Sequence, residues 1–480
     1  MNGRMVMRVL GWICLIYGAL MLLPVIVGVI YGERVSQFLI TMTGCAALGG
    51  ILMIPAPTSR SLVARDGFAI VGLGWIGISM IGAVPFVLSG SIPHYVDALF
   101  ETASGLSTTG SSVLQDFEGM PRCDMFWRIF SHWIGGMGVL VFLMAVLPMS
   151  GEHSMHIMRA EVPGPTVGKL VPRARRTAGI LYLIYIGLTA VEFVCLLLAG
   201  MNVYNALLHS FSTAGTGGFS TMAGSIADFH SPVIETILSV FMLLFGVNFN
   251  LYYLILIGAV GKAFRNEELR RYAAIILAAV FLISLELHRT MSVPVRTAVH
   301  DAFFNVASLL STTGFGTSDF TEWSEPCKWV LILLMFCGGC AGSTGGGIKV
   351  SRVIILLRSF RAEVQKMVRP RSVVRVQLEG QRVAPETVRA ASVFVLLYML
   401  FLLLFSFLIS FDGFDIATSF TAALSCLSNI GPGMTKLIGP AGSFAVFSSR
   451  SKLVLTVAML MGRLEIYPIL VLFSPRTWQR

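Results

Sequence analysis

The chain has 480 residues, of which 55% are hydrophobic and only 12% charged, and its mean hydropathy is +0.79. Soluble domains have about 25% charged residues, and their cores cannot hide so much apolar surface in a chain of this length. The composition therefore excludes a soluble enzyme, a disordered chain and a nucleic-acid-binding domain, and it predicts an integral membrane protein. The 48 glycines indicate close helix packing or non-helical backbone within the membrane.

Apolar stretches long enough to cross a bilayer, about 20 residues each, follow one another along the chain. We expect about ten spans, at residues 9–31, 35–56, 67–90, 126–149, 177–200, 233–261, 272–288, 326–356, 389–411 and 452–474. The first stretch is too long for the apolar region of a signal peptide, so we expect it to be retained.

The net charge of +10 is distributed unevenly between the two sides that these spans define. With the N-terminus inside, the inner segments hold 25 Lys and Arg but 8 Asp and Glu, whereas the outer segments hold 9 and 14. The inner segments are 1–8, 57–66, 150–176, 262–271, 348–389 and 475–480. By the positive-inside rule, this bias predicts a multi-pass protein with both termini in the cytoplasm.

Four outer segments have the pattern of short amphipathic helices that run into a glycine tip. They begin near His94, Tyr204, Thr297 and Asp415, and their tip glycines Gly110, Gly218, Gly314 and Gly431 recur at intervals of 108, 96 and 117 residues. The second tip also contains Thr213-Ala-Gly215; we prefer Gly218 because Gly218-Phe219 matches Gly314-Phe315. Each segment is too short to span a bilayer and lies between two spans, so the pattern indicates a fourfold internal repeat.

The repeat predicts an all-α integral membrane fold with four tandem helix–pore-loop–helix repeats around one pore. An N-terminal two-helix hairpin at 1–66 precedes repeats at 67–150, 151–261, 262–358 and 359–480. Non-helical backbone within a membrane is tolerated only where protein buries it or where it lines a water-filled path. Four such tips around one axis can present a ring of carbonyls that replaces the hydration shell of a cation.

Several motifs carry a resemblance to a known family. The Thr-x-Gly tips look like degenerate K⁺-channel filters, and the order of the pieces is similar to that of the TrkH/TrkG/KtrB family of bacterial potassium-uptake proteins. Glu161-Val-Pro-Gly-Pro165 resembles the family's linker, Cys340-Ala-Gly-Ser-Thr-Gly-Gly-Gly-Ile-Lys349 its intramembrane loop, and Met461-Gly-Arg-Leu-Glu465 its last pore helix. The N-terminal hairpin resembles the Trk branch.

The resemblance implies potassium uptake, with K⁺ as the transported ion and no organic cofactor. It implies a filter of mainly backbone carbonyls at Thr108, Thr109, Gly110, Thr216, Gly217, Gly218, Thr312, Thr313, Gly314, Asn429, Ile430 and Gly431. Related plant transporters associate Ser at the first filter position with Na⁺ preference, so glycine in all four tips favours K⁺. The implied gate comprises Gly342, Ser343, Thr344, Gly345, Gly346, Gly347, Lys349 and Arg463.

Arg463 lies in an apolar run, where an unpaired cation costs at least about 2.5–3.5 kcal/mol. It forms either a positive barrier in the pore or a structural ion pair with Glu465 or another buried acid. Glu192 and Glu235 are either buried structural acids or, less favoured, proton-coupling groups. We expect His132 and His209 to be packing residues, because neither has other metal ligands near it in the sequence.

The resemblance also implies partners and a location: a homodimer in the lipid of the bacterial inner membrane, with a cytoplasmic RCK-type (TrkA-like) nucleotide-binding regulatory subunit. Segments 150–176 and 348–389 would be the docking surfaces for that subunit, and no nucleic acid is expected. Both channel-like flux and ion-coupled symport fit the sequence. The alternative functions are a proton- or sodium-coupled secondary transporter of another solute, which predicts inverted repeats, and a membrane-embedded enzyme, for which the sequence offers no convergent titratable groups.

Overall fold

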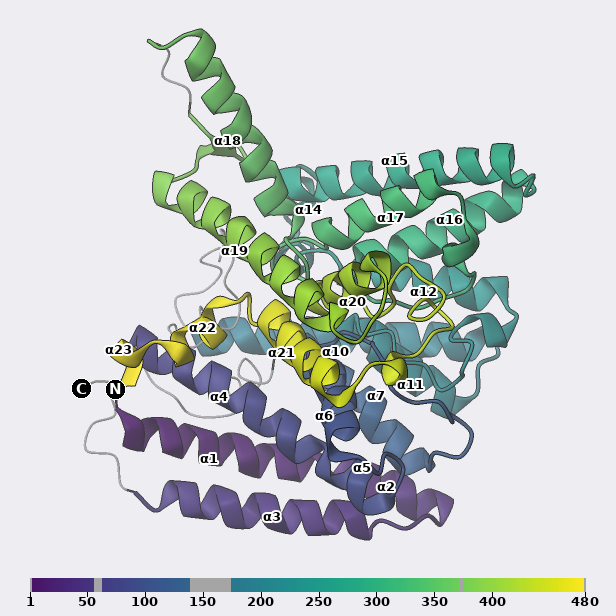
Figure 1. The fold of residues 1–480 in the computed structure, drawn as a ribbon, viewed down its shortest axis with the longest axis vertical. Coiled ribbons are helices and arrows are strands. Elements are labelled where there is room, and N and C mark those ends of the chain that lie inside the picture. The colour runs from purple at the N-terminus through teal and green to yellow at the C-terminus, as the bar shows by residue number, and fades with distance from the viewer. Residues whose placement is uncertain (1, 56–62, 139–173, 372–374, 479–480) are drawn as a thin grey trace.

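The computed structural model describes residues 2–55, 63–138, 174–371 and 375–478, and these ranges are mostly helical (Figure 1). The helices are α1 (Gly3–Leu20), α2 (Leu22–Tyr31), α3 (Ser36–Met53), α4 (Ala64–Gly82), α5 (Val84–Ser89), α6 (Tyr95–Leu106), α7 (Arg122–Gly136), α10 (Ala174–Leu198), α11 (Val203–Gly215), α12 (Pro232–Phe245), α13 (Phe249–Leu256), α14 (Val260–Phe264), α15 (Glu267–Thr290), α16 (Val295–Leu310), α17 (Glu325–Cys337), α18 (Val350–Val368), α19 (Pro385–Ser410), α20 (Ile416–Ser428), α21 (Ser449–Arg463), α22 (Tyr467–Phe473) and α23 (Pro475–Trp478). Strands β1 (Gln377–Leu378) and β2 (Gln381–Arg382) form a small antiparallel hairpin.

Six helical stretches of the described ranges are long and apolar enough to cross a membrane: Gly3–Tyr31, Ser36–Met53, Arg65–Ser89, Ala178–Leu198, Glu267–Thr290 and Pro385–Ser410. The number rises to eight if each of two bent pairs is counted as one span: α12 with α13, which meet at 91°, and α21 with α22, which meet at 118°. The expected span at 126–149 begins in α7 and continues outside the described residues. The expected span at 326–356 is interrupted, since α17 ends at Cys337 and α18 begins at Val350.

The spans are apolar on both faces, as α19 illustrates. Phe394, Tyr398 and Leu402 lie on its buried face, while Leu396 and Leu403 are among the large apolar residues exposed on the other. Each set repeats with helical spacing, so one face packs against protein and the other remains for lipid.

The short helices α6, α11, α16 and α20 occur where the sequence predicts them, and longer helices surround them (Figure 1). α6 packs against α4, α7 and α21, and α20 packs against α17, α19 and α21. The hairpin of α1 and α3 covers α4 on one side of the molecule. The first turn of α1 and the C-terminal α23 lie at the same end, and α18 projects beyond the body (Figure 1).

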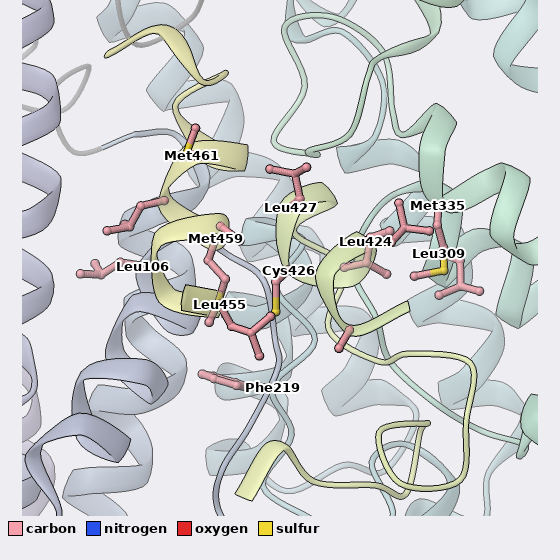
Figure 2. Packing of buried hydrophobic residues seen from close by; sticks show 14 of the residues in the cluster. Leu106, Phe219, Leu309, Met335, Leu424, Cys426, Leu427, Leu455, Met459 and Met461 are labelled. Carbon is pink, nitrogen blue, oxygen red and sulfur yellow. The ribbon is translucent and has the colours of Figure 1, made fainter. Parts of the chain in front are cut away.

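Buried apolar residues enclose the ends of the short helices. Figure 2 shows Leu455 and Met459 of α21 beside Cys426 at the end of α20, with Leu106 at the end of α6 nearby. These four residues are all buried. The packing keeps the non-helical segments that follow the short helices inside protein, which is the condition for irregular backbone in a membrane.

Candidate functional site

The four short helices end in the same hydrogen-bonded cap. At the end of α6, the N–H of Thr109 donates to Ser104 O at 2.8 Å and the N–H of Thr108 donates to Gly105 O at 3.1 Å. This pair of bonds defines a Schellman motif. The other three helices repeat it, with the N–H groups of Gly217, Thr313 and Ile430 donating to the O atoms of Ser212, Ser308 and Ser425 at 2.8, 2.9 and 3.0 Å.

The cap needs one residue in the left-handed conformation, and at none of these four helix ends is that residue glycine. Thr108, Thr216, Thr312 and Asn429 have φ values of 56°, 53°, 60° and 56°. Such a residue costs about 1–2 kcal/mol, and a β-branched residue is unusual there. Two of the side chains make specific contacts: Thr312 Oγ1 accepts the N–H of Gly346 at 2.8 Å, and Asn429 Nδ2 donates to Thr109 Oγ1 at 2.9 Å.

The four tips, residues 108–110, 216–218, 312–314 and 429–431, contact one another in a closed ring. Their glycines Gly110, Gly218, Gly314 and Gly431 have φ values of 84°, 79°, 84° and 108°. A Cβ on the first three would overlap, in turn, Gly217 O, Thr313 O and Ile430 O of the next tip, and a Cβ on Gly431 would lie 2.9 Å from Thr109 O. The contacts therefore run from tip 1 to tip 4 and back to tip 1, and we call this arrangement the ring.

The second tip has two candidate glycines in the sequence, and the structure places them differently. Gly218 is part of the ring. Gly215 is the last residue of α11, and a Cβ there would overlap His132 O of α7. Gly218 is thus the geometric equivalent of the other three tip glycines.

All four tip glycines line one cavity of about 280 Å³ on the side of the segments that follow the tips. Its other lining residues include Ser111, Ser112 and Phe219, and among its described lining residues Arg128 is the charged one. The described residues contain no group of three or more His, Cys, Asp and Glu placed to hold a metal ion. The oxygens that the tips bring to the ring are those of backbone carbonyls and hydroxyls, and four helix C-termini add partial negative charge.

A glycine-rich stretch between α17 and α18, residues 338–349, lies against the ring from the other side; we call it the glycine segment. Besides the bond from Gly346 to Thr312, a Cβ on Gly345 would lie 2.9 Å from Ser311 O, and one on Gly346 would overlap Ser428 O. The segment therefore contacts tips 3 and 4. The predicted break of the helix by these glycines is confirmed.

The bend between α12 and α13 anchors the middle of the glycine segment. Gly342 O accepts the N–H of Phe249 at 3.0 Å, and Thr344 Oγ1 donates to Phe245 O at 3.2 Å. Ser343 Oγ donates within the segment, to Cys340 O at 2.7 Å. The bent helix pair α12–α13 thus holds the glycine segment, which lies between α17 and α18.

Arg463, the last residue of α21, binds backbone oxygens. Its guanidinium donates to Thr344 O of the glycine segment at 2.6 Å and to Gly135 O and Gly136 O at the end of α7. One side chain therefore joins three parts of the structure that are distant in sequence. The carbonyls satisfy the hydrogen-bonding groups of a cation placed in an apolar region.

Two buried carboxylates hold the glycine segment at its ends. Glu465 pairs with Lys349 at 3.1 Å and with Arg352. Glu268, at the start of α15, accepts the N–H groups of Ala341 at 2.8 Å and Ser351 at 3.0 Å through Oε1. Lys349, predicted at the gate, is thus part of an ion-pair network.

A buried ion pair beside the ring is not among the residues predicted from the sequence. Glu101 of α6 and Arg128 of α7 lie 2.6 Å apart. A buried acid on a short helix of small and apolar residues is the signal that could have indicated it. His132, expected as a packing residue, also makes hydrogen-bonding contacts near this ion pair. Its Nδ1 lies 2.7 Å from Gly105 O, and its Nε2 accepts the N–H of Phe219 at 3.3 Å.

The remaining candidate groups lie elsewhere. Glu192 is fully buried on α10, Glu235 lies 3.4 Å from His300 Nδ1, and neither lines the cavity beside the ring. His209 is buried, with Nε2 3.0 Å from Ser220 Oγ. The proposed docking segment 150–176 falls almost wholly outside the described residues.

Membrane-spanning helices around short helices whose tips meet in a ring of backbone oxygens are an arrangement suited to a protein that transports cations. Residues 34–480 match the model of the TrkH family, described as a cation transport protein. The chain belongs to the TrkH family.

Individual relatives agree over the whole chain. It is 36% identical over 487 residues to the Trk system potassium uptake protein TrkH of Salmonella typhimurium, covering 100% of both chains. It is 34% identical over 481 residues to the potassium uptake protein TrkG of Escherichia coli, covering 99% of both. The crystal structure of the potassium transporter TrkH from Vibrio parahaemolyticus matches with a TM-score of 0.89 and 32% identity, covering 100% of both chains. The predicted helical membrane fold and the family resemblance are confirmed, and these relatives are transporters, not enzymes.

Replacing Gly110 by Ala tests the close approach within the ring. Gly90 has nearly the same φ, 82° against 84°, but open space where a Cβ would be. We expect Gly90→Ala to cost about 1–2 kcal/mol through backbone strain alone, and Gly110→Ala to lower the thermal unfolding midpoint in detergent by clearly more. Equal shifts for the two variants would contradict the contact with Gly217 O.

Glu465→Gln tests the anchor of the glycine segment. Removing one partner of a buried ion pair typically costs about 3–5 kcal/mol, so we expect a large drop in the thermal unfolding midpoint. The control is Glu363→Gln, because Glu363 pairs with Lys366 at 2.7 Å on the exposed surface of α18, where such pairs contribute about 1 kcal/mol or less. A drop no larger than that of the control would refute the anchoring role.

Proposed function

We propose that this chain is the ion-translocating subunit of a bacterial potassium-uptake system and that the ring is its selectivity filter. The observation that carries the proposal is the closed ring of four equivalent tips. The filter residues are Thr108, Thr109 and Gly110 with their equivalents Thr216, Gly217, Gly218, Thr312, Thr313, Gly314, Asn429, Ile430 and Gly431. K⁺ is the transported substrate: it loses water at the cavity beside the ring and gains carbonyl oxygens in exchange.

We infer that the glycine segment and Arg463 form the gate. Gly345 and Gly346 support this role because they contact tips 3 and 4 directly. Arg463 adds a positive charge on that side of the ring, in contact with Thr344. A fixed cation raises the free energy of a permeating cation, so the segment and the guanidinium together close the path until both move.

The sidedness and partners of the chain are part of the same proposal. The first turn of α1, α23 and the start of α19 occupy one end of the molecule (Figure 1), which supports both termini on the cytoplasmic face of the inner membrane. α18 projects there and carries Arg358, Arg361 and Lys366, a surface suited to an RCK-type regulatory subunit. Exposed Leu357 and Phe360 on the same helix support a homodimer. We also propose that the chain divides into an N-terminal hairpin and four repeats, each of which contains one of the short helices α6, α11, α16 and α20 with its tip.

Uptake of ⁸⁶Rb⁺ tests the proposed function. We expect the chain to restore growth at low K⁺ in bacterial cells that lack potassium uptake, and Gly314→Ala to abolish the rescue at equal membrane expression, because a Cβ there overlaps Ile430 O. Liposomes with K⁺, Na⁺ and H⁺ gradients set independently then separate channel-like flux from symport. Absence of Rb⁺ flux in both systems, or full rescue by Gly314→Ala, would overturn the proposal.

Arg463→Ala tests the gate. We expect ⁸⁶Rb⁺ flux into liposomes to rise roughly tenfold, since removing about 1.4 kcal/mol of barrier changes a rate by that factor. The control is Arg450→Ala, which removes an exposed cation from the other end of α21 and should leave the flux unchanged. An unchanged or reduced flux for Arg463→Ala at equal incorporation would contradict a barrier role.

A further inference from the structure

Glu101 and Arg128 form an ion pair that is almost completely removed from solvent. Glu101 Oε1 lies 2.6 Å from Arg128 Nε, and the exposed fractions of the two side chains are 0% and 1%. Burying two charges is costly even when they pair, and replacing such pairs by apolar residues is often neutral or stabilising. Stability alone is therefore a weak reason for this pair, and its other contacts indicate what it does.

The pair connects the segments that leave tips 1 and 2. Glu101 accepts the N–H of Val113 through Oε2 and the hydroxyl of Ser112 through Oε1, both at 2.8 Å. Both hydrogen bonds that Glu101 accepts thus come from residues that closely follow Gly110 in the chain.

Arg128 makes the complementary contacts. It donates through Nη1 to Ser220 O and through Nη2 to Ser112 Oγ, both at 3.1 Å, and its guanidinium carbon lies 3.6 Å from the centre of the Phe219 ring. Phe219 directly follows Gly218. The two charges together thus span the gap between tip 1 and tip 2.

The same position differs in each repeat. Nine residues before each tip glycine stand Glu101, His209, Asn305 and Ala422. His209 Nε2 lies 3.0 Å from Ser220 Oγ, and Asn305 Nδ2 donates to Ser318 Oγ at 3.0 Å, whereas a methyl group makes no hydrogen bond. All four positions lie on the short helices that precede the tips, and of the four residues Glu101 alone is a carboxylate.

We propose that Glu101 and Arg128 are positioning residues that fix the distance between tips 1 and 2 and thereby set the preference for K⁺ over Na⁺. Glu101 has a second effect, because it neutralises the guanidinium that lines the cavity beside the ring. This inference rests on the ring being the filter. If the ion pair is removed, the carbonyls of tips 1 and 2 can move closer together and coordinate a smaller ion, so the preference for K⁺ over Na⁺ falls.

The experiment measures ⁸⁶Rb⁺ influx into liposomes and its inhibition by Na⁺ for the full-length protein. Glu101→Gln is expected to raise the KM for Rb⁺ about tenfold, the low end of what charge in a cleft does to local ion concentration, and to lower the Rb⁺/Na⁺ ratio. In the double variant Glu101→Gln/Arg128→Gln, the unpaired positive charge is gone, but the ion pair that joins tips 1 and 2 is still missing. The KM for Rb⁺ should therefore return toward the wild-type value, while the Rb⁺/Na⁺ ratio stays low.

Two further variants separate positioning from folding. Glu33→Gln is the matched control, because Glu33 also accepts two N–H groups, of Arg122 and Cys123 at 2.8 Å, but does so away from the ring; it should leave KM and selectivity unchanged. Glu101→Asp keeps the charge but is too short for both of its contacts, so it should retain the KM and lose selectivity. Size-exclusion profiles identify any variant that fails to fold.

The outcomes are distinct. If wild-type protein shows no Rb⁺ preference, the proposed function itself fails. If the wild-type protein prefers Rb⁺ over Na⁺, and Glu101→Gln and Glu101→Asp fold and show the same preference as wild type, the positioning role is overturned. The assignment of the ring as the filter then still stands. Restored selectivity in the double variant would also overturn it, because that result leaves charge neutralisation as the whole effect.

Discussion

Backbone carbonyls at the end of a helix have no partner within that helix, and the structure is organised around four such ends that meet in one place. Each Schellman motif binds its N–H groups back to the helix and then turns the chain sharply. Each tip glycine leaves room for an oxygen of the next tip, as at Gly110 with Gly217 O and Gly218 with Thr313 O. The four tips therefore fit together only at this close approach, and the surrounding helices must bring all four to one place.

Charges beside the ring are satisfied in the same way, largely by backbone groups. Arg463 donates to carbonyls of two segments, and Glu268 accepts the N–H of Ala341 in the glycine segment and that of Ser351 at the start of α18. Such bonds remove most of the cost of placing a charge in an apolar region. They also fix the positions of segments that have no helix or strand of their own.

The repeat was predictable from the sequence because each tip is local: a short amphipathic helix, a hydroxyl or amide residue and a glycine within a few positions. The bend between α21 and α22 was not, since its positive φ values occur at Glu465 and Ile466 and not at a glycine. Nor was the Glu101–Arg128 pair, because its value depends on Ser112 and Ser220, which only the folded chain brings together. The choice of Gly218 over Gly215 needed one comparison between repeats, and the contact with Thr313 O supports the same choice.

The ring is fourfold in its backbone but not in its side chains. The residues before the tip glycines are Thr109, Gly217, Thr313 and Ile430, which share one backbone hydrogen bond but include a glycine and an isoleucine beside two threonines. The positions of the backbone oxygens at the ring therefore do not require the same side chain in every tip. Tips 1 and 2 are joined by a buried ion pair, whereas tips 3 and 4 contact the glycine segment. If the glycine segment is the gate that we propose, its movement reaches tips 3 and 4 first, while the buried Glu101–Arg128 pair keeps the spacing of tips 1 and 2.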